Sequence, residues 1–373
     1  MEKNRLTKKI MILGVGNAQV DLIDYCKQNN FEVHTCSYKR EGSGLQSSDI
    51  FNLIDVKNAV KIEQYLIENS IPIVYSIGSD IAIPTIAEVT SKLGLPSFVS
   101  HDTAINCKNK DLLRIKLRKN KTSEVPYTSG KSIEDFMGWN IYPAIMKPTD
   151  SQGQRGVTRI DSKDELTNKF ETVKSYSDSG NVIVEKFIQG DEISVNAYVV
   201  NGQVMLSIIS DRIIFEEYTG GLVKEHVIPS KFSQNDNVIK KVEELVKSTI
   251  SELEINNGPA YFQIKVENNI PYLIEVTPRL DGCHMWKLIE RSTKVNLLDI
   301  TLNHLINDNV NQRDFEYHHV VPHRLIFKCS PPGVPLNRTN IEGENVKWYL
   351  DEGQTVPKLN GIMEKTGYYI IKE

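Results

Sequence analysis

The sequence predicts an open parallel α/β domain followed by an α+β region in which antiparallel strands predominate. Three observations support this fold class. Strand-like apolar runs alternate with helical patterns over about the first hundred residues, which is typical of βαβ units and a parallel sheet. An Asn201-Gly202 dipeptide lies between two later apolar runs and indicates a hairpin. A second pair of strand-like runs flanks Asn268-Asn269.

The bulk properties are typical of a globular protein with two or three domains. The chain has 373 residues and a net charge of −4, and a quarter of its residues are charged. A charge this small gives no indication of a nucleic acid or a membrane as a partner. The five cysteines form no Cys-x-x-Cys pair, and the N-terminal residues show no pattern of a secretion signal. We therefore expect a cytoplasmic location.

The first domain is predicted to span residues 1–104. An apolar run at 9–15 ends at Gly14-Val15-Gly16, and a helical pattern follows it. The third glycine of the dinucleotide fingerprint is missing, so these glycines indicate a tight strand-to-helix turn more than a dinucleotide site. Because the turn lies at the carboxyl edge of the sheet, it could face a substrate. The other elements expected here are strands at 31–35, 50–54 and 71–77 and helices at 58–69 and 80–93.

The character of the sequence changes at about residue 105. An amphipathic helix is predicted at 236–254, where apolar residues recur at helical spacing. The segment beyond residue 305 is smaller than the preceding one, and strand patterns predominate in it. We therefore place a second region at 105–305 and a third at 306–373. The other elements expected are a polar helix at 109–119 and strands at 142–147, 157–160, 181–188, 193–200, 203–209, 260–266 and 271–276.

Lys147 ends an apolar strand and precedes Pro148, so a stiff backbone orients it. A polar loop with Gly153 and Gly156 follows, and its glycines would let backbone amides approach an anion closely. From this segment alone, an ordinary hairpin turn is an equally good interpretation.

Gln263 and Glu275 are twelve residues apart on two strands of one predicted hairpin, so they are expected to be near neighbours. Both interrupt apolar runs. A polar group that points into a core must be compensated, and a magnesium ion would provide this. Placement on the solvent face is the alternative.

Taken together, these segments resemble the ATP-grasp superfamily, in the branch similar to the carbamoyl-phosphate synthase large subunit, biotin carboxylase and the amino-acid ligases. The resemblance runs from Lys110 to Gly282. Each motif is weak alone, and their order and spacing carry the resemblance. It implies that residues 1–104 are the domain that usually precedes the ATP-grasp fold and that 141–188 form a small subdomain over the ATP.

The resemblance implies that ATP binds between two α+β subdomains with Mg²⁺, or possibly Mn²⁺. Phosphate contacts are implied for Lys110 and Lys147, of which Lys147 would also take part in catalysis. The remaining nucleotide contacts would come from the mobile loop with Gln152, Gly153 and Gly156, from the adenine hinge Glu185, Lys186, Phe187 and Ile188, and from the ribose-binding acid Glu192.

The metal ligands implied by the resemblance are Gln263, Glu275 and Thr277, and Arg279 would stabilise the transferring phosphate. The family usually has Glu-x-Asn-Pro-Arg here, so Thr277 replaces an asparagine, and Gln263 is neutral where many members carry an acid. The site has few negative ligands, so we expect weak Mg²⁺ binding before ATP is present.

The function implied is that of an ATP-dependent carboxylate–amine ligase, an ADP-producing enzyme that forms a C–N bond through an acyl phosphate. Small amino-acid-like substrates are expected, and Arg212, Asp281 and His284 are candidates to contact them. The alternatives are a kinase or a carbamoyl-phosphate-synthase-like phosphorylating enzyme, and a non-catalytic nucleotide-binding protein. A homodimer is possible. The sequence identifies neither the substrates nor the pathway.

Overall fold

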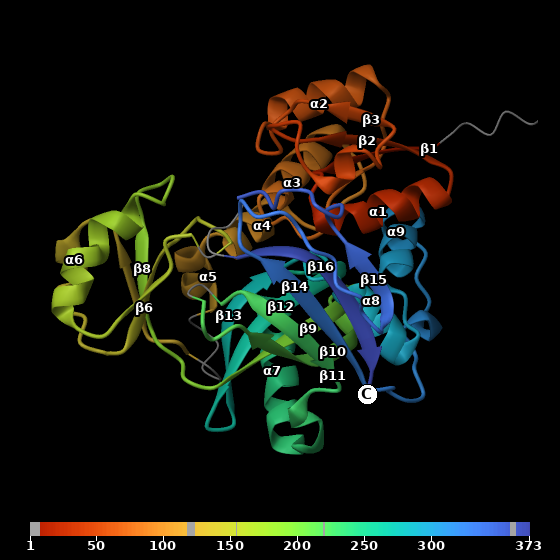
Figure 1. Cartoon of the computed structure of the whole chain (residues 1–373). Helices are drawn as coiled ribbons and strands as arrows, with labels where there is room; N and C mark the ends of the chain where they lie inside the picture. The colour runs from red at the N-terminus through yellow and green to blue at the C-terminus, as the bar shows by residue number, and fades with distance from the viewer. Residues whose placement is uncertain (1–7, 118–123, 154, 219–220, 359–362) are drawn as a thin grey trace, which may run out of the picture.

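The computed structural model describes residues 8–117, 124–153, 155–218, 221–358 and 363–373. The first seven residues of the predicted N-terminal domain, the end of the predicted helix 109–119 and one position of the predicted phosphate loop, Gln154, lie outside this set. Three sheets organise the described chain (Figure 1). Among these residues, no helix is long and apolar enough to cross a membrane.

The N-terminal domain contains a parallel four-stranded sheet of order β3-β2-β1-β4, as the alternating pattern predicted. The side chains of β1 alternate between two cores, because Met11 and Leu13 contact α2 and α3 while Ile10 and Ile12 lie on the α1 side. The bounds are β1 (Lys8–Leu13), α1 (Asn17–Gln28), β2 (Phe31–Cys36), β3 (Ile50–Asn52), α2 (Ala59–Glu68), β4 (Val74–Tyr75) and α3 (Ala82–Leu93), with a short 3₁₀ turn, η1 (Ser43–Leu45), after β2.

Two helices, α4 (His101–Lys108) and α5 (Lys110–Leu117), lead to a small antiparallel sheet of order β5-β8-β6-β7. This sheet and α6 form the separate lobe on the left of Figure 1. The apolar side of α6 packs on Ala144 and Met146 of β6. The lobe also includes β5, which precedes residue 141. The bounds are β5 (Tyr127–Gly130), η3 (Ile133–Phe136), β6 (Ala144–Pro148), β7 (Thr158–Ile160), α6 (Lys163–Lys174) and β8 (Val182–Lys186).

The third sheet is antiparallel and has the order β13-β12-β9-β10-β11-β14-β16-β15. The predicted hairpin between β9 and β10 turns at Asn201 and Gly202, which both have positive φ, as a two-residue hairpin turn requires. The C-terminal strands extend this sheet. The strand bounds are β9 (Asp191–Val200), β10 (Gln203–Ile214), β11 (Val223–Ile228), β12 (Gly258–Glu267), β13 (Ile270–Thr277), β14 (His323–Ser330), β15 (Glu344–Trp348) and β16 (Glu364–Lys372).

The two faces of the large sheet pack differently. On one face, α7 covers Ile193, Val195 and Phe262, and the helix lies where the amphipathic pattern predicted it. On the other face, α8 and α9 pack beside the N-terminal domain, and both contribute to one apolar core. The remaining bounds are η4 (Lys231–Gln234), α7 (Asp236–Glu252), α8 (Met285–Thr293), α9 (Leu297–Asn307) and η5 (Gln312–Phe315).

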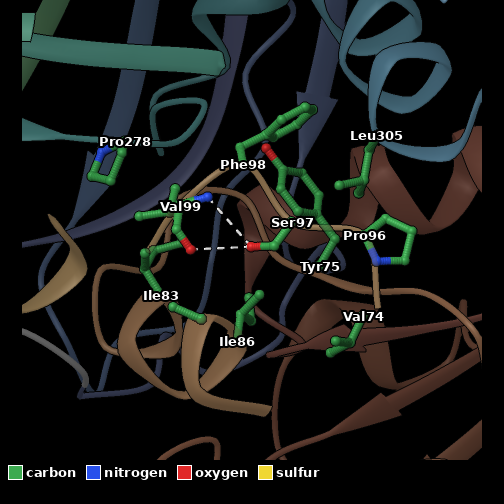
Figure 2. A pocket seen from close by; sticks show the side chains of 11 residues that line it. Val74, Tyr75, Ile83, Ile86, Pro96, Ser97, Phe98, Val99, Pro278 and Leu305 are labelled. Carbon is green, nitrogen blue, oxygen red and sulfur yellow. Dashed lines mark hydrogen bonds between the residues drawn. The ribbon is translucent and has the colours of Figure 1, made fainter. Parts of the chain in front are cut away.

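A small pocket lies where the N-terminal domain meets α9 and the end of β13 (Figure 2). Tyr75, Phe98, Pro278 and Leu305 line it together with other side chains, none of them charged. Its one serine, Ser97, exchanges hydrogen bonds with the backbone of Val99, at 3.2 and 3.3 Å. The pocket therefore offers no charged group to a ligand.

Candidate active site

A buried ion-pair cluster joins the small lobe to the large sheet. Glu185 on β8 accepts a hydrogen bond from Nε of Arg114 on α5 at 2.6 Å, and its other oxygen lies 2.5 Å from Nζ of Lys147 on β6. Arg114 also donates to the carbonyl of Leu273 on β13, at 2.8 Å. Burial opposes ionisation of Glu185, but the two cations outweigh it and lower its pKa to about 2. The carboxylate thus fixes Lys147 where the lobe meets the sheet.

Lys110 lies at the start of α5 and points toward the same region. Its Nζ donates to the Ser151 carbonyl at 2.7 Å, which ties the helix to the loop after β6. Burial lowers the pKa of Lys110, and the positive charge of Lys147 acts in the same direction. The charges of Glu275 and Glu185 oppose this change. Four charged groups from different elements therefore act on one another at this point.

The predicted metal-binding residues lie side by side. Gln263 on β12 and Glu275 on β13 were expected to be near neighbours, and they are direct partners in the register of the two strands. Thr277 is buried, and its hydroxyl has no hydrogen-bond partner within the described chain. All three side chains offer the oxygen ligands that Mg²⁺ prefers, and only Glu275 adds a negative charge. This donor set fits a magnesium ion that is also held by phosphate oxygens.

Glu192 begins β9 beside these residues. Its Oε1 accepts hydrogen bonds from Gln263 and from Arg212 on β10. Burial opposes the charge of Arg212, but Glu192 and other anionic neighbours raise its pKa. The hydrogen bonds and the ion pair of Glu192 within the described residues all involve Oε1, which leaves Oε2 for a ligand hydroxyl. Arg212 is already paired with a protein carboxylate in this arrangement.

Arg279 follows β13 and is held by the N-terminal domain. Its Nε donates to Asp80 at 2.6 Å, a second nitrogen pairs with the same carboxylate, and Nη1 donates to the Leu280 carbonyl at 3.1 Å. Burial opposes the charge of Arg279, but Asp80, Asp281 and Glu275 raise its pKa. The guanidinium is therefore a permanent cation beside the predicted metal ligands.

The predicted phosphate loop depends on glycine at two different kinds of position. Gly153 has φ +62° with open space around it, whereas a Cβ at Gly156, φ +72°, would lie 2.9 Å from Pro148 and Tyr176. Gln152 next to Gly153 is partly exposed. The loop is therefore open at Gly153 and tightly packed at Gly156.

The predicted adenine hinge connects the lobe to the large sheet. Lys186 forms an ion pair with Glu267 at 2.8 Å, and the backbone N–H of Phe187 donates to Pro143 at 3.0 Å. The carbonyl of Ile188 accepts from Lys265 at 3.3 Å. These contacts fix the segment between β8 and β9, and the side chain of Glu185 is occupied by the buried ion-pair cluster.

The two remaining substrate candidates have different surroundings. His284 is buried, with Nδ1 2.7 Å from Asp21, Nε2 2.7 Å from the Tyr349 hydroxyl, and its ring stacked on Tyr368. Both of its nitrogens are therefore occupied. Asp281 is also buried, but its Oδ2 has no partner in the part of the chain described. Burial raises the pKa of Asp281, although backbone amides and Arg279 oppose this shift.

Sequence reasoning missed Arg114, Asp80 and His226. Arg114 lies four residues after Lys110, on the same helix face, and that spacing was an available signal. Asp80 follows β4 at the carboxyl edge of the parallel sheet, where ligand sites of such sheets occur. His226 lies in a strand of mixed polar and apolar residues, and only strand pairing places it opposite Arg212.

Residues 140–286 match the family model described as the ATP-grasp domain. Among curated relatives, the chain is 25% identical over 193 residues to a formate-dependent phosphoribosylglycinamide formyltransferase of Prochlorococcus marinus, which covers 50% of each chain. It is 25% identical to an L-arginine-specific L-amino acid ligase of Bacillus subtilis, over 54% of this chain and 50% of that protein. It is 24% identical to a D-alanine–D-alanine ligase of Flavobacterium johnsoniae, over 77% and 91%. The chain spans about half the length of the first two proteins.

Solved structures match over nearly the whole chain. An L-amino acid ligase from Bacillus licheniformis aligns with a TM-score of 0.80 at 19% identity, over 98% of this chain and 93% of that one. The biotin carboxylase domain of a Hydrogenobacter thermophilus 2-oxoglutarate carboxylase, solved with MgADP, also has a TM-score of 0.80, at 14% identity over 98% and 86%. The fold is thus an ATP-grasp domain preceded by a parallel α/β domain. Residues 140–286 thus match the ATP-grasp domain, and the chain as a whole is similar to these structures in its fold.

Proposed function

We propose that this chain is an ATP-dependent carboxylate–amine ligase that works through an acyl phosphate. The observation that carries the proposal is the position of Glu275. It pairs with Gln263 in strand register, and its charge acts on Lys110, Arg212 and Arg279, which come from three other parts of the chain. In this proposal the metal-binding oxygens would lie next to the cations that contact the phosphates, among them Lys110 and Arg279. Two of the relatives described above are ligases by name, which supports a ligase over a kinase.

The residues of this centre have separable roles. Bound ATP with Mg²⁺ would supply the phosphoryl group that activates a carboxylate. Lys110, Lys147 and Arg279 would offset the repulsion between that group and the carboxylate, which is the main electrostatic barrier to the transfer. The free oxygen of Glu192 would accept a hydrogen bond from the ribose. Gln263, Glu275 and Thr277 would hold the metal.

The loop through Gly153 and Gly156 would shield the activated carboxyl group from water until an amine attacks it. The exposed tip at Gly153 would provide the movement, and the packed turn at Gly156 would provide the pivot. The amine would then displace phosphate, and the products would be an amide, ADP and phosphate.

The decisive experiment is a screen of small carboxylates and amines in pairs for ADP release. Release that needs both partners is the expected result. ADP formation with one substrate and a stable phosphorylated product would instead indicate a kinase or a carbamoyl-phosphate-synthase-like enzyme. Nucleotide binding without turnover on any pair would indicate the non-catalytic alternative. We consider that alternative because Thr277 stands where the family usually has an asparagine.

A further inference from the structure

A second cluster of ligand-type side chains lies beside the proposed ATP site. His226 comes from β11, and Asp281 and Cys283 come from the segment between β13 and α8. One ligand atom from each residue lies within 4.8 Å of the corresponding atoms of the other two. The steps proposed above for ATP chemistry use neither the imidazole nor the thiol.

The cluster contains buried polar atoms with unmet hydrogen-bonding capacity. His226 is fully buried, and neither ring nitrogen makes a hydrogen bond of ordinary geometry among the described residues, although the backbone of Asp211 lies close enough to act on the ring. The Oδ2 of Asp281, which is 2% exposed, likewise has no hydrogen-bond partner among the described residues. An unsatisfied buried group costs about 1–3 kcal/mol, so two residues of this kind converging on one point indicate a ligand that compensates them.

The surrounding backbone holds the cluster in place. Oδ1 of Asp281 accepts from the backbone N–H groups of Cys283 at 2.9 Å and Met285 at 3.3 Å, which leaves Oδ2 as the free atom. A Cβ at Gly78 would lie 2.8 Å from the Cα of Gly282, so the N-terminal domain presses directly on this segment. The Asp281 carboxylate is therefore positioned without a ligand, as a binding site requires.

The mixture of donors indicates the kind of ligand. Imidazole nitrogen, carboxylate oxygen and thiolate sulfur together suit a borderline-soft divalent cation, whereas Mg²⁺ would require oxygens alone. Burial, with the charges of Arg212 and Lys365, lowers the pKa of His226 well below its usual range. The imidazole is thus neutral, which is the form that binds metals.

Two cations face the cluster and must be accounted for. Arg212 lies opposite His226 in strand register and is neutralised by Glu192, and Nζ of Lys365 on β16 lies 3.5 Å from the Cys283 sulfur. A carboxylate and a thiolate balance the charge of a divalent ion. The cationic neighbours then favour an anionic group, such as a substrate carboxylate, in a fourth coordination position.

We propose that His226, Asp281 and Cys283 form a binding site for a borderline-soft divalent cation such as Zn²⁺, distinct from the magnesium position at Gln263 and Glu275. Three protein ligands leave one position open, the arrangement of zinc sites that also bind a small molecule. On binding, the Cys283 thiol releases its proton to solvent. The proposal does not depend on the ligase assignment.

The test uses Co²⁺ as a spectroscopic substitute for Zn²⁺ in the full chain after chelator treatment. One equivalent should bind and produce a thiolate-to-cobalt charge-transfer band in the near ultraviolet, and added Zn²⁺ should abolish it. Cys283→Ser should remove the band. His226→Gln and Asp281→Asn should each weaken Co²⁺ binding by at least the roughly 10- to 100-fold that loss of a residue supporting a metal ligand costs.

Matched controls keep the result specific. Cys329→Ser removes a partly buried thiol on β14 that is outside the cluster, and Glu275→Gln alters the proposed magnesium position. Both variants should retain the charge-transfer band, and circular dichroism should show every variant folded. The proposal is overturned if folded wild-type protein gives no such band at one equivalent, or if Cys329→Ser removes it as Cys283→Ser does.

Discussion

Two groups of buried polar residues meet near the proposed ATP site, and they differ in how they are satisfied. Glu185 has a cation on each carboxylate oxygen, so the cluster with Arg114 and Lys147 is complete within the protein. In contrast, the Thr277 hydroxyl and one Asp281 oxygen have no partner within the described residues. The first group holds the lobe against the large sheet, whereas the second leaves bonding capacity for molecules outside the chain.

This difference distinguishes buried polar residues that stabilise the fold from buried polar residues that bind a ligand. A buried ion pair adds little to the free energy of unfolding, because the cost of desolvating the two charges offsets their attraction. Removing one partner is strongly destabilising, because it leaves a buried charge unpaired. An unsatisfied buried group already costs stability, so its removal should be tolerated by the fold and felt only by the ligand. Substitutions in the two groups should therefore affect different measurements.

Glu185→Gln should have the largest effect on stability. It leaves Arg114 and Lys147 buried without their anion, which should cost about 3–5 kcal/mol at neutral pH. The folded-state pKa of Glu185, about 2, is below the ordinary 4.5, so the carboxylate stabilises above pH 4.5 and loses this contribution as the pH falls toward 2. Denaturant unfolding of both proteins across that range should show their difference shrinking with acid. A constant difference would contradict the role of the ionised carboxylate.

Lys147→Met should reduce ATP-dependent ADP release by about 100- to 1,000-fold, or ~3–4 kcal/mol in the activation barrier, because a cation for the transferred phosphoryl group is lost. The matched control is Lys169→Met on α6, in the same lobe, where the partly exposed lysine forms an i,i+4 pair with Glu165 and donates to the Arg159 carbonyl at 3.2 Å. That control should stay within about twofold of wild type. Equal turnover in the two variants would remove Lys147 from the proposed mechanism.

Most of the fold could be predicted from local patterns. Period-two and period-3.6 apolar spacing located the parallel domain, the β9–β10 hairpin and α7. The turn at Asn268-Asn269 was sufficient to predict that Gln263 and Glu275 are near neighbours. These features depend on residues that are close in sequence. The strand pairing that sets this register is a property of one hairpin.

The parts that sequence reasoning missed depend on distant pairing. Asp80 reaches Arg279 from another domain, 199 residues away, and Arg114 reaches Glu185 across 71 residues. The ring nitrogens of His226 lack hydrogen-bond partners within the described chain because of the packing of β10, β11 and the segment after β13, which are far apart in sequence. Local patterns place Arg114 beside Lys110 on α5 and Asp80 after β4, but they do not identify the distant residue that each one contacts.

Asp80→Asn tests whether this inter-domain contact positions Arg279. The variant keeps a hydrogen-bond acceptor but loses the charge that fixes the guanidinium, so kcat should fall by about 10- to 100-fold with little change in KM for ATP. Asp80→Glu should recover part of the loss. If the two variants changed KM alone, Asp80 would act in nucleotide binding and not in positioning.

Thr277→Val should have the smallest effect on stability, and it tests the second group directly. The buried hydroxyl has no partner within the described residues, so its replacement by a methyl group should change the free energy of unfolding by less than about 1 kcal/mol, or raise it. The Mg²⁺ concentration that half-saturates turnover should nevertheless rise, because one oxygen ligand is lost. Thr277→Asn should lower it, and neither variant nor wild type should bind Mg²⁺ tightly without nucleotide. Strong destabilisation with an unchanged Mg²⁺ requirement would show that the hydroxyl belongs to the fold, and the contrast between the two groups would then fail at this position.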